Sequence, residues 1–243
     1  MRKNISVIVL GIILMSLFAC CSYSAPMDWL KSKLSTVSSA KLSDTKVGPG
    51  LKEALKVGIE KTINLLSQKD GYFGNQAVKI LLPESVKKAE PLLRNIGVGP
   101  KIDEFTLSMN RAAEKAAPVA ADIFSSAITE MSFDNAQKVL QGGNAAATDY
   151  LKDKTQAKLL EQFQPVVRKA MDDYAVTNKF EEIMSKAQTL PLVGKFTKNI
   201  DINKYVSSKA LDGLFKILGQ QEANIRTNPA ARVTDLLKQV FSE

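Results

Sequence analysis

The sequence offers few residues that could carry out catalysis. It contains no histidine, which excludes a Ser-His-Asp triad, a Cys-His dyad and any metal site or pH switch built on imidazole. Its two cysteines, Cys20 and Cys21, adjoin one another at the end of the first apolar segment, so the rest of the chain has no thiol and no disulfide. We therefore expect no catalytic residue, no cofactor, no metal ligand and no enzymatic activity.

The remaining catalytic patterns have simpler explanations. Ser85 and Lys88 match the S-x-x-K spacing of serine-lysine enzymes, as do Ser38 and Lys41, but the accompanying S-D-N and K-T-G elements are absent. Ser85 also stands at a plausible helix start, where a serine caps the helix. The adjacent acids at 172–173 and 181–182 point to different helix faces, and nothing indicates a glycosidase pair.

Two pairs of opposite charges have helical spacing. Arg111 and Glu114 are three residues apart, and Glu222 and Arg226 are four apart, so each pair can meet on one face of a helix. Both pairs lie in segments rich in alanine or leucine, where a half-buried arginine–carboxylate pair would fix the helix register. We interpret them as a structural ion network; solvated surface pairs and contact with an anionic ligand are the alternatives.

The N-terminus has the pattern of a secretory signal peptide. Met1–Asn4 carries two positive charges and Ile5–Ala19 is an apolar run of fifteen residues. A helix of that length spans about 22 Å, less than the roughly 30 Å of a bilayer core. With no stop-transfer pattern after it, the sequence predicts that residues 1–19 are removed during export.

The cleavage site has two interpretations. Leu17–Cys20 resembles a bacterial lipobox, which predicts that Cys20 becomes the lipidated first residue and anchors the chain in a membrane. Because residue 21 is not aspartate, the resemblance suggests the outer membrane. The alternative is ordinary cleavage near Ala25 and a soluble periplasmic protein, although Pro26 disfavours a cut at that bond.

The charge of the chain does not indicate a nucleic-acid partner. The formal net charge is +8, and loss of residues 1–19 removes two of the 33 basic residues and none of the 25 acidic ones. The basic residues alternate with acidic ones along the chain, with no long run of like charge and no interleaved aromatic residues. This pattern is typical of solvated helix faces, and a weak attraction to anionic lipid is the functional alternative.

The body of the chain is predicted to be all-α, a bundle of several helices in a single domain at 48–243 after a tether with a short helix at 20–47. Gly48–Gly50 marks the boundary, and further helices are expected from Glu84 to Ile96 and after Asn228–Pro229. Apolar residues recur every three or four positions, as an amphipathic helix requires. The first such stripe comprises Leu51, Leu55, Ile59, Ile63 and Leu66.

Prolines and polar residues predict where helices break and begin. Pro118 and Pro165 lie inside apolar-periodic segments and are expected to interrupt them, because proline removes a backbone donor and clashes with the preceding turn. Ser132 and Asn144 are expected to cap the helices that follow them. The segment 189–200 is expected to be a loop.

Four blocks of the sequence resemble a bacterial domain-of-unknown-function family, number 4197. The blocks are Gly50–Leu55, Asn110–Glu114 with Ala116–Pro118, Gly142–Tyr150, and Lys209–Phe215 followed by Glu222, Ile225–Arg226 and Asn228–Pro229. The resemblance implies an exported helical protein and covers nearly all of the chain from about residue 48. It transfers no catalytic residue.

Taken together, these features predict a cell-envelope helical lipoprotein that acts as a non-enzymatic interaction or structural module, with an envelope protein or lipid as its partner. The alternative is a carrier that holds a lipid or other apolar ligand between its helices. The residues that would line such a pocket are Tyr150, Tyr174, Phe163, Met109, Met131, Met171 and Met184, although their helical spacing is typical of an ordinary core.

Overall fold

The computed structural model describes residues 44–188, 200–235, 238 and 241. These residues form one compact unit, and they contain helices and no strand, which confirms the all-α prediction. The α-helices are α2 (Asp44–Ser67), α3 (Glu84–Lys87), α4 (Glu90–Asn95), α5 (Gly99–Ala116), α6 (Ala120–Thr129), α7 (Phe133–Gln141), α8 (Ala146–Asp173), α9 (Val176–Gln188) and α10 (Ile202–Thr227); η1 (Ala117–Val119) and η2 (Pro229–Ala231) are short 3₁₀ helices. The predicted signal peptide, Cys20, Ser38 and most of the loop at 189–200 lie outside the described residues.

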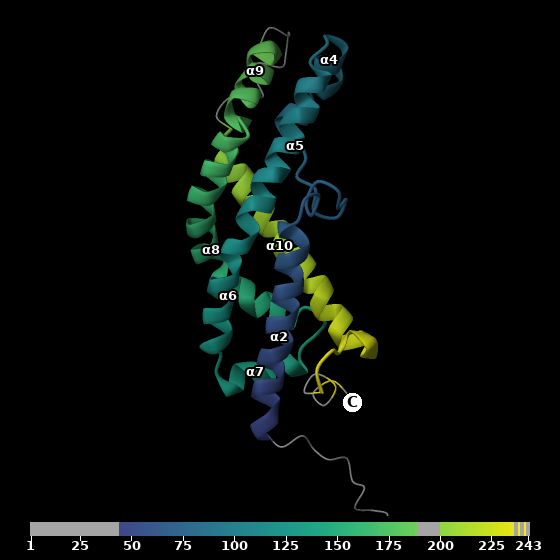
Figure 1. Cartoon of the computed structure of the whole chain (residues 1–243), viewed down its shortest axis with the longest axis vertical. Helices are drawn as coiled ribbons and strands as arrows, with labels where there is room; N and C mark the ends of the chain where they lie inside the picture. Colours follow the sequence, from purple (N-terminus) through teal and green to yellow (C-terminus); the bar gives the residue numbers. More distant parts are fainter. Residues whose placement is uncertain (1–43, 189–199, 236–237, 239–240, 242–243) are drawn as a thin grey trace, which may run out of the picture. The chain divides into compact units, whose positions relative to one another are not determined.

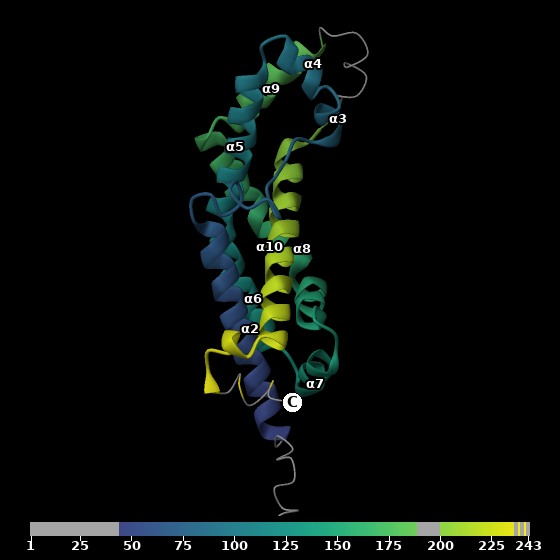
Figure 2. The same cartoon turned by 90° about the vertical axis from the view of Figure 1, so that its right-hand side faces the viewer.

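The long helices pack side by side around one core. α10 lies against α8 and α2, while α5 packs against α8 and α9 and α6 against α2 and α8 (Figures 1 and 2). The apolar stripes supply the core: Leu51, Leu55, Ile59 and Leu66 of α2 are buried, and Ile63 is partly buried against the same core. None of the helices in the described ranges has a stretch long and apolar enough to cross a membrane.

The two internal prolines behave differently. At Pro118 the helix breaks as predicted, since α5 ends at Ala116 and η1 leads into α6. At Pro165 the prediction of an interruption is wrong, because α8 continues from Ala146 to Asp173. Phe163 and Val167 are fully buried on either side of Pro165, while Pro165 and Glu161, whose carbonyl loses its helical donor, are exposed. Packing therefore holds the helix together, and water can hydrate the free carbonyl.

The start of α2 also differs from the expected boundary. The helix begins at Asp44 and runs through Pro49. Gly48 and Gly50 are buried while Pro49 is exposed, and the ring of Phe133 from α7 would lie 3.6 Å from a Cβ placed on Gly48. A Cβ at Gly48 would therefore make only ordinary van der Waals contact, and the helix continues through this point, where the sequence suggested a boundary.

The single helix expected at Glu84–Ile96 is two short helices, α3 and α4. Pro91 cannot continue a preceding helix and stands in the first turn of α4. In α4 and at its C-terminal end, Leu92 and Ile96 are each 50% exposed. After α10, Asn228 caps η2 by accepting a hydrogen bond from the Ala230 amide (3.0 Å). The prediction of a regular terminal helix beginning at Pro229 is wrong, because η2 is a 3₁₀ helix of three residues and residues 232–234 are not helical. Residues 236, 237, 239, 240, 242 and 243 lie outside the described residues.

Candidate functional site

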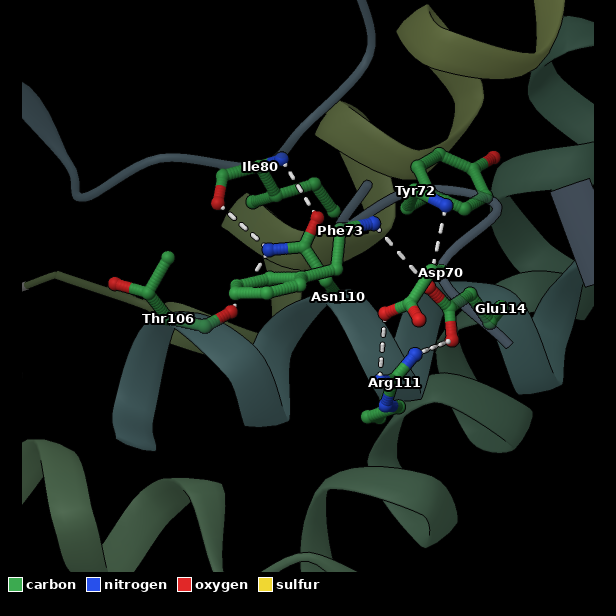
Figure 3. Close-up of polar contacts among 8 residues, drawn as sticks. All are labelled: Asp70, Tyr72, Phe73, Ile80, Thr106, Asn110, Arg111 and Glu114. Carbon is green, nitrogen blue, oxygen red and sulfur yellow. Dashed lines mark hydrogen bonds and ion pairs between the residues drawn. The ribbon is translucent and has the colours of Figure 1, made fainter. Parts of the chain in front are cut away.

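The loop of residues 68–83 joins α2 to α3 without forming a helix, so its buried backbone groups need partners outside the loop. Asn110 of α5 supplies one set (Figure 3). Its side-chain oxygen accepts from the Ile80 amide (2.8 Å), and its nitrogen donates to the Ile80 carbonyl (2.9 Å) and the Thr106 carbonyl (2.7 Å). The side-chain amide of Asn110 thereby satisfies the backbone N–H and carbonyl of Ile80, as the backbone of a neighbouring strand would do in a sheet.

Glu114, one turn further along α5, holds the start of the same loop. One carboxylate oxygen accepts from the amides of Tyr72 (3.1 Å) and Phe73 (3.2 Å), and the other accepts from Arg111 (2.7 Å) (Figure 3). Arg111 also donates to Asp70 (2.8 Å), which adopts a left-handed conformation (φ 69°) in the turn. Asn110, Arg111 and Glu114 are called the loop clamp below.

Tyr72 attaches the loop to α10 as well. Its side chain is fully buried, and its hydroxyl donates to the Ala210 carbonyl (2.8 Å). Burial raises the pKa of this phenol well above its ordinary value, and the charge of Glu114 adds to the increase. Gly213 makes room for the ring, because a Cβ there would lie 2.8 Å from its Cε1 atom. The loop is therefore held between α5 and α10.

Glu222 of α10 caps the N-terminus of α8. Its carboxylate accepts from the amides of Ala147 (2.9 Å) and Thr148 (2.8 Å) and from the Thr148 hydroxyl (2.8 Å). The prediction that Asn144 caps this helix is wrong: the N-cap position is Ala145, which has no capping side chain. A buried carboxylate from a distant helix satisfies the free amides and opposes the positive end of the helix dipole.

Arg226 completes this arrangement at the end of α7. Its guanidinium donates to Glu222 (3.0 Å) and to the carbonyls of Leu140 (3.1 Å) and Val139 (2.8 Å), in the last turn of α7. The negative side chain thus meets a helix N-terminus and the positive one a helix C-terminus, as the helix dipoles favour. Glu222 and Arg226 are called the helix-end clamp below.

The four charged residues singled out from the sequence therefore form two separate clusters. Arg111 with Glu114 and Glu222 with Arg226 make ion pairs within their own helices, and each pair also binds chain segments far away in the sequence. Sequence reasoning missed the main neutral members, Asn110 and Tyr72. No signal in the sequence distinguished Asn110 from the other polar residues of its helix.

The members of the two clusters are carboxylates, guanidinium groups, an amide and hydroxyls, and each is bound to backbone or to another charged side chain. The serine-lysine pair at 85–88 lies in and just after the four-residue helix α3. Asp173 makes ion pairs with Lys115 and Lys169. In the part of the chain that the structure describes, no group of three or more acidic or cysteine side chains could hold a metal ion.

The fold and these clusters define an all-α protein whose buried charges hold its own segments in place. A family model described as "Protein of unknown function (DUF4197)" matches residues 41–242, and the chain belongs to this family. The matched range contains all four sequence blocks that suggested the resemblance. No curated protein and no solved structure matches the chain.

Proposed function

We propose that this chain is a cell-envelope lipoprotein whose helical body serves as a non-enzymatic interaction or structural module. The observation that carries the proposal is the use of the buried charges. Glu114 and Glu222 are 4% and 8% exposed, and the carboxylate of each accepts hydrogen bonds from backbone amides and from an arginine of its own helix. Such groups give a body a defined shape, and they leave no obvious acid or base for chemistry.

The packing of the interior supports a module rather than a carrier. Phe163, Met109 and Met171 are fully buried in the core, and Tyr174 is exposed. Among the described residues, a cavity of about 20 Å³ lies between α2, α8 and α10, lined partly by Leu51, Leu218 and Glu222. That volume is close to the room needed for one water molecule and far below that of an acyl chain.

Mass spectrometry of organic extracts separates the module from the carrier. Protein purified from its native envelope without added lipid is expected to release no stoichiometric apolar molecule other than acyl groups covalently attached to Cys20. A stoichiometric non-covalent lipid that survives purification would favour the carrier and contradict the proposal.

The membrane anchor is tested at Cys20. The lipobox-like sequence Leu17–Cys20 supports lipidation and outer-membrane placement; acyl chains contribute about 0.8 kcal/mol per buried CH₂, so several chains anchor a protein stably. Cys20→Ala is expected to remove the chain from the outer-membrane fraction, leaving it soluble in the periplasm or uncleaved. Cys21→Ala is the matched control and is expected to fractionate like wild type. Unchanged fractionation of the Cys20 variant would refute the lipid anchor.

A further inference from the structure

A groove of about 300 Å³ lies beside the loop clamp, between the loop 68–83, α3, α4 and α5. Its size is at the lower end of small-ligand sites. Phe73 and Leu82 of the loop and Thr106 of α5 contribute to its walls, and Leu81 stands at its margin with 49% of its surface exposed. The groove is thus partly apolar. The charged side chains that line it determine which class of ligand it can bind.

The two carboxylates of the groove, Glu90 and Asp103, are both bound by Arg94. The guanidinium donates to Glu90 (2.9 Å) and makes two hydrogen bonds with Asp103 (2.6 and 3.2 Å). The hydrogen bonds from Arg94 lower the pKa of Asp103 below its ordinary value, and the nearby charge of Lys79 acts in the same direction. The acids of the groove and this arginine therefore largely neutralise one another.

Two lysines that line the groove have no strong ion pair within the described residues. The Lys79 ammonium group lies 3.9 Å from the centroid of the Phe73 ring and makes no ion pair within the described residues. The Lys87 ammonium group lies 3.7 Å from Glu84, whose side chain is 80% exposed and does not line the groove. An exposed pair at this distance is weak and is readily replaced by a better anion. With Arg94, the lining carries three cations against two carboxylates.

We propose that this groove binds the phosphate headgroup of an anionic amphiphile. The phosphate would lie between Lys79 and Lys87, where ammonium groups make charge-assisted hydrogen bonds to its oxygens. The first carbons of the acyl chain would cover Leu81 and the edge of Phe73. The inference goes beyond the module proposed above and places a lipid on the surface of the body rather than between its helices.

Isothermal titration calorimetry tests the site with defined probes on the full chain carrying Cys20→Ala, so that no attached acyl chain competes. The probes are dodecyl phosphate below its micelle concentration, inorganic phosphate, and dodecyl maltoside as an uncharged amphiphile. Lys79→Gln with Lys87→Gln removes both uncommitted charges. Lys152→Gln with Lys216→Gln is the matched control, because both lysines are exposed and lie on α8 and α10 away from the groove. Circular dichroism checks that each variant is folded.

Dodecyl phosphate is expected to bind with a 1:1 stoichiometry and more tightly than either other probe. The Lys79/Lys87 variant should weaken its binding about tenfold, a loss of about 1.4 kcal/mol, and the control should change it less than twofold. Leu81→Gln should weaken binding of dodecyl phosphate and leave that of inorganic phosphate unchanged. If inorganic phosphate bound as tightly as dodecyl phosphate, the ligand would be free phosphate, and the proposal of an amphiphile would be wrong. If dodecyl phosphate did not bind 1:1, or if the Lys79/Lys87 variant and the Lys152/Lys216 variant lost the same amount of affinity, the groove would not be the binding site.

Discussion

Glu114→Ala is expected to lower the free energy of unfolding by about 3–5 kcal/mol, the range for removing one partner of a buried ion pair. The substitution leaves the Tyr72 and Phe73 amides without their acceptor. It also leaves Arg111, whose side chain is 17% exposed, with Asp70 as its remaining ion-pair partner among the described residues. Chemical denaturation monitored by circular dichroism measures the change, provided that the transition is two-state.

Two variants make this result specific to the loop clamp. Glu104→Ala, at an exposed position of the same helix, is expected to change the stability by less than about 0.5 kcal/mol. Glu114→Gln keeps an acceptor oxygen for the loop amides but loses the charge, so its stability is expected to lie between those of wild type and Glu114→Ala. If Glu114→Ala were no more destabilising than Glu104→Ala, the loop would not depend on this carboxylate for its attachment.

The second large effect is expected for Glu222→Ala, again about 3–5 kcal/mol. Here the loss includes the cap of α8, since the Ala147 and Thr148 amides and the Thr148 hydroxyl lose their acceptor. Arg226, whose side chain is 10% exposed, loses the only carboxylate with which it forms an ion pair within the described residues. Uncapping alone accounts for about 1 kcal/mol, and the unpaired guanidinium accounts for most of the remainder.

Hydrogen exchange locates this second effect. The amides in the first two turns of α8 should exchange faster in Glu222→Ala, because that end of the helix frays when its cap is removed. Asp212→Ala removes an exposed acid from the same helix, paired with Lys209 at 3.4 Å, and should leave both stability and exchange in α8 nearly unchanged. Equal protection of α8 in the Glu222 variant and wild type would show that another group caps the helix.

The helices could be predicted from the sequence because the apolar periodicity is a local property. The stripe at Leu51–Leu66 predicted the buried face of α2, and Pro118 predicted the break between α5 and α6. Proline alone could not predict whether a helix breaks, because the outcome depends on what packs around it. Pro165 is tolerated since its ring faces solvent while Phe163 and Val167 are held in the core.

Only the contacts within one helix could be predicted for the two clusters of charged residues. Helical spacing shows that Arg111 can reach Glu114, but no spacing shows that Glu114 binds amides 41 and 42 residues earlier. The cap of α8 illustrates the same limit, because Asn144 is the best local candidate and Glu222, 74 residues away from Thr148 in sequence, takes the role through the tertiary fold. Local propensity competes with long-range contacts, and the propensity of one side chain is easily outweighed.

The contacts made by α10 bear on the order in which the newly made chain can fold. The Tyr72 hydroxyl bonds to a carbonyl 138 residues later, and Glu222 binds amides 74 and 75 residues earlier. Synthesis proceeds from the N-terminus, so α10 leaves the ribosome after the other long helices of the described residues, and contacts of such high contact order form late. Until then the loop around Tyr72 and the first turn of α8 lack these partners, so neither segment can reach its final packing before α10 has been made.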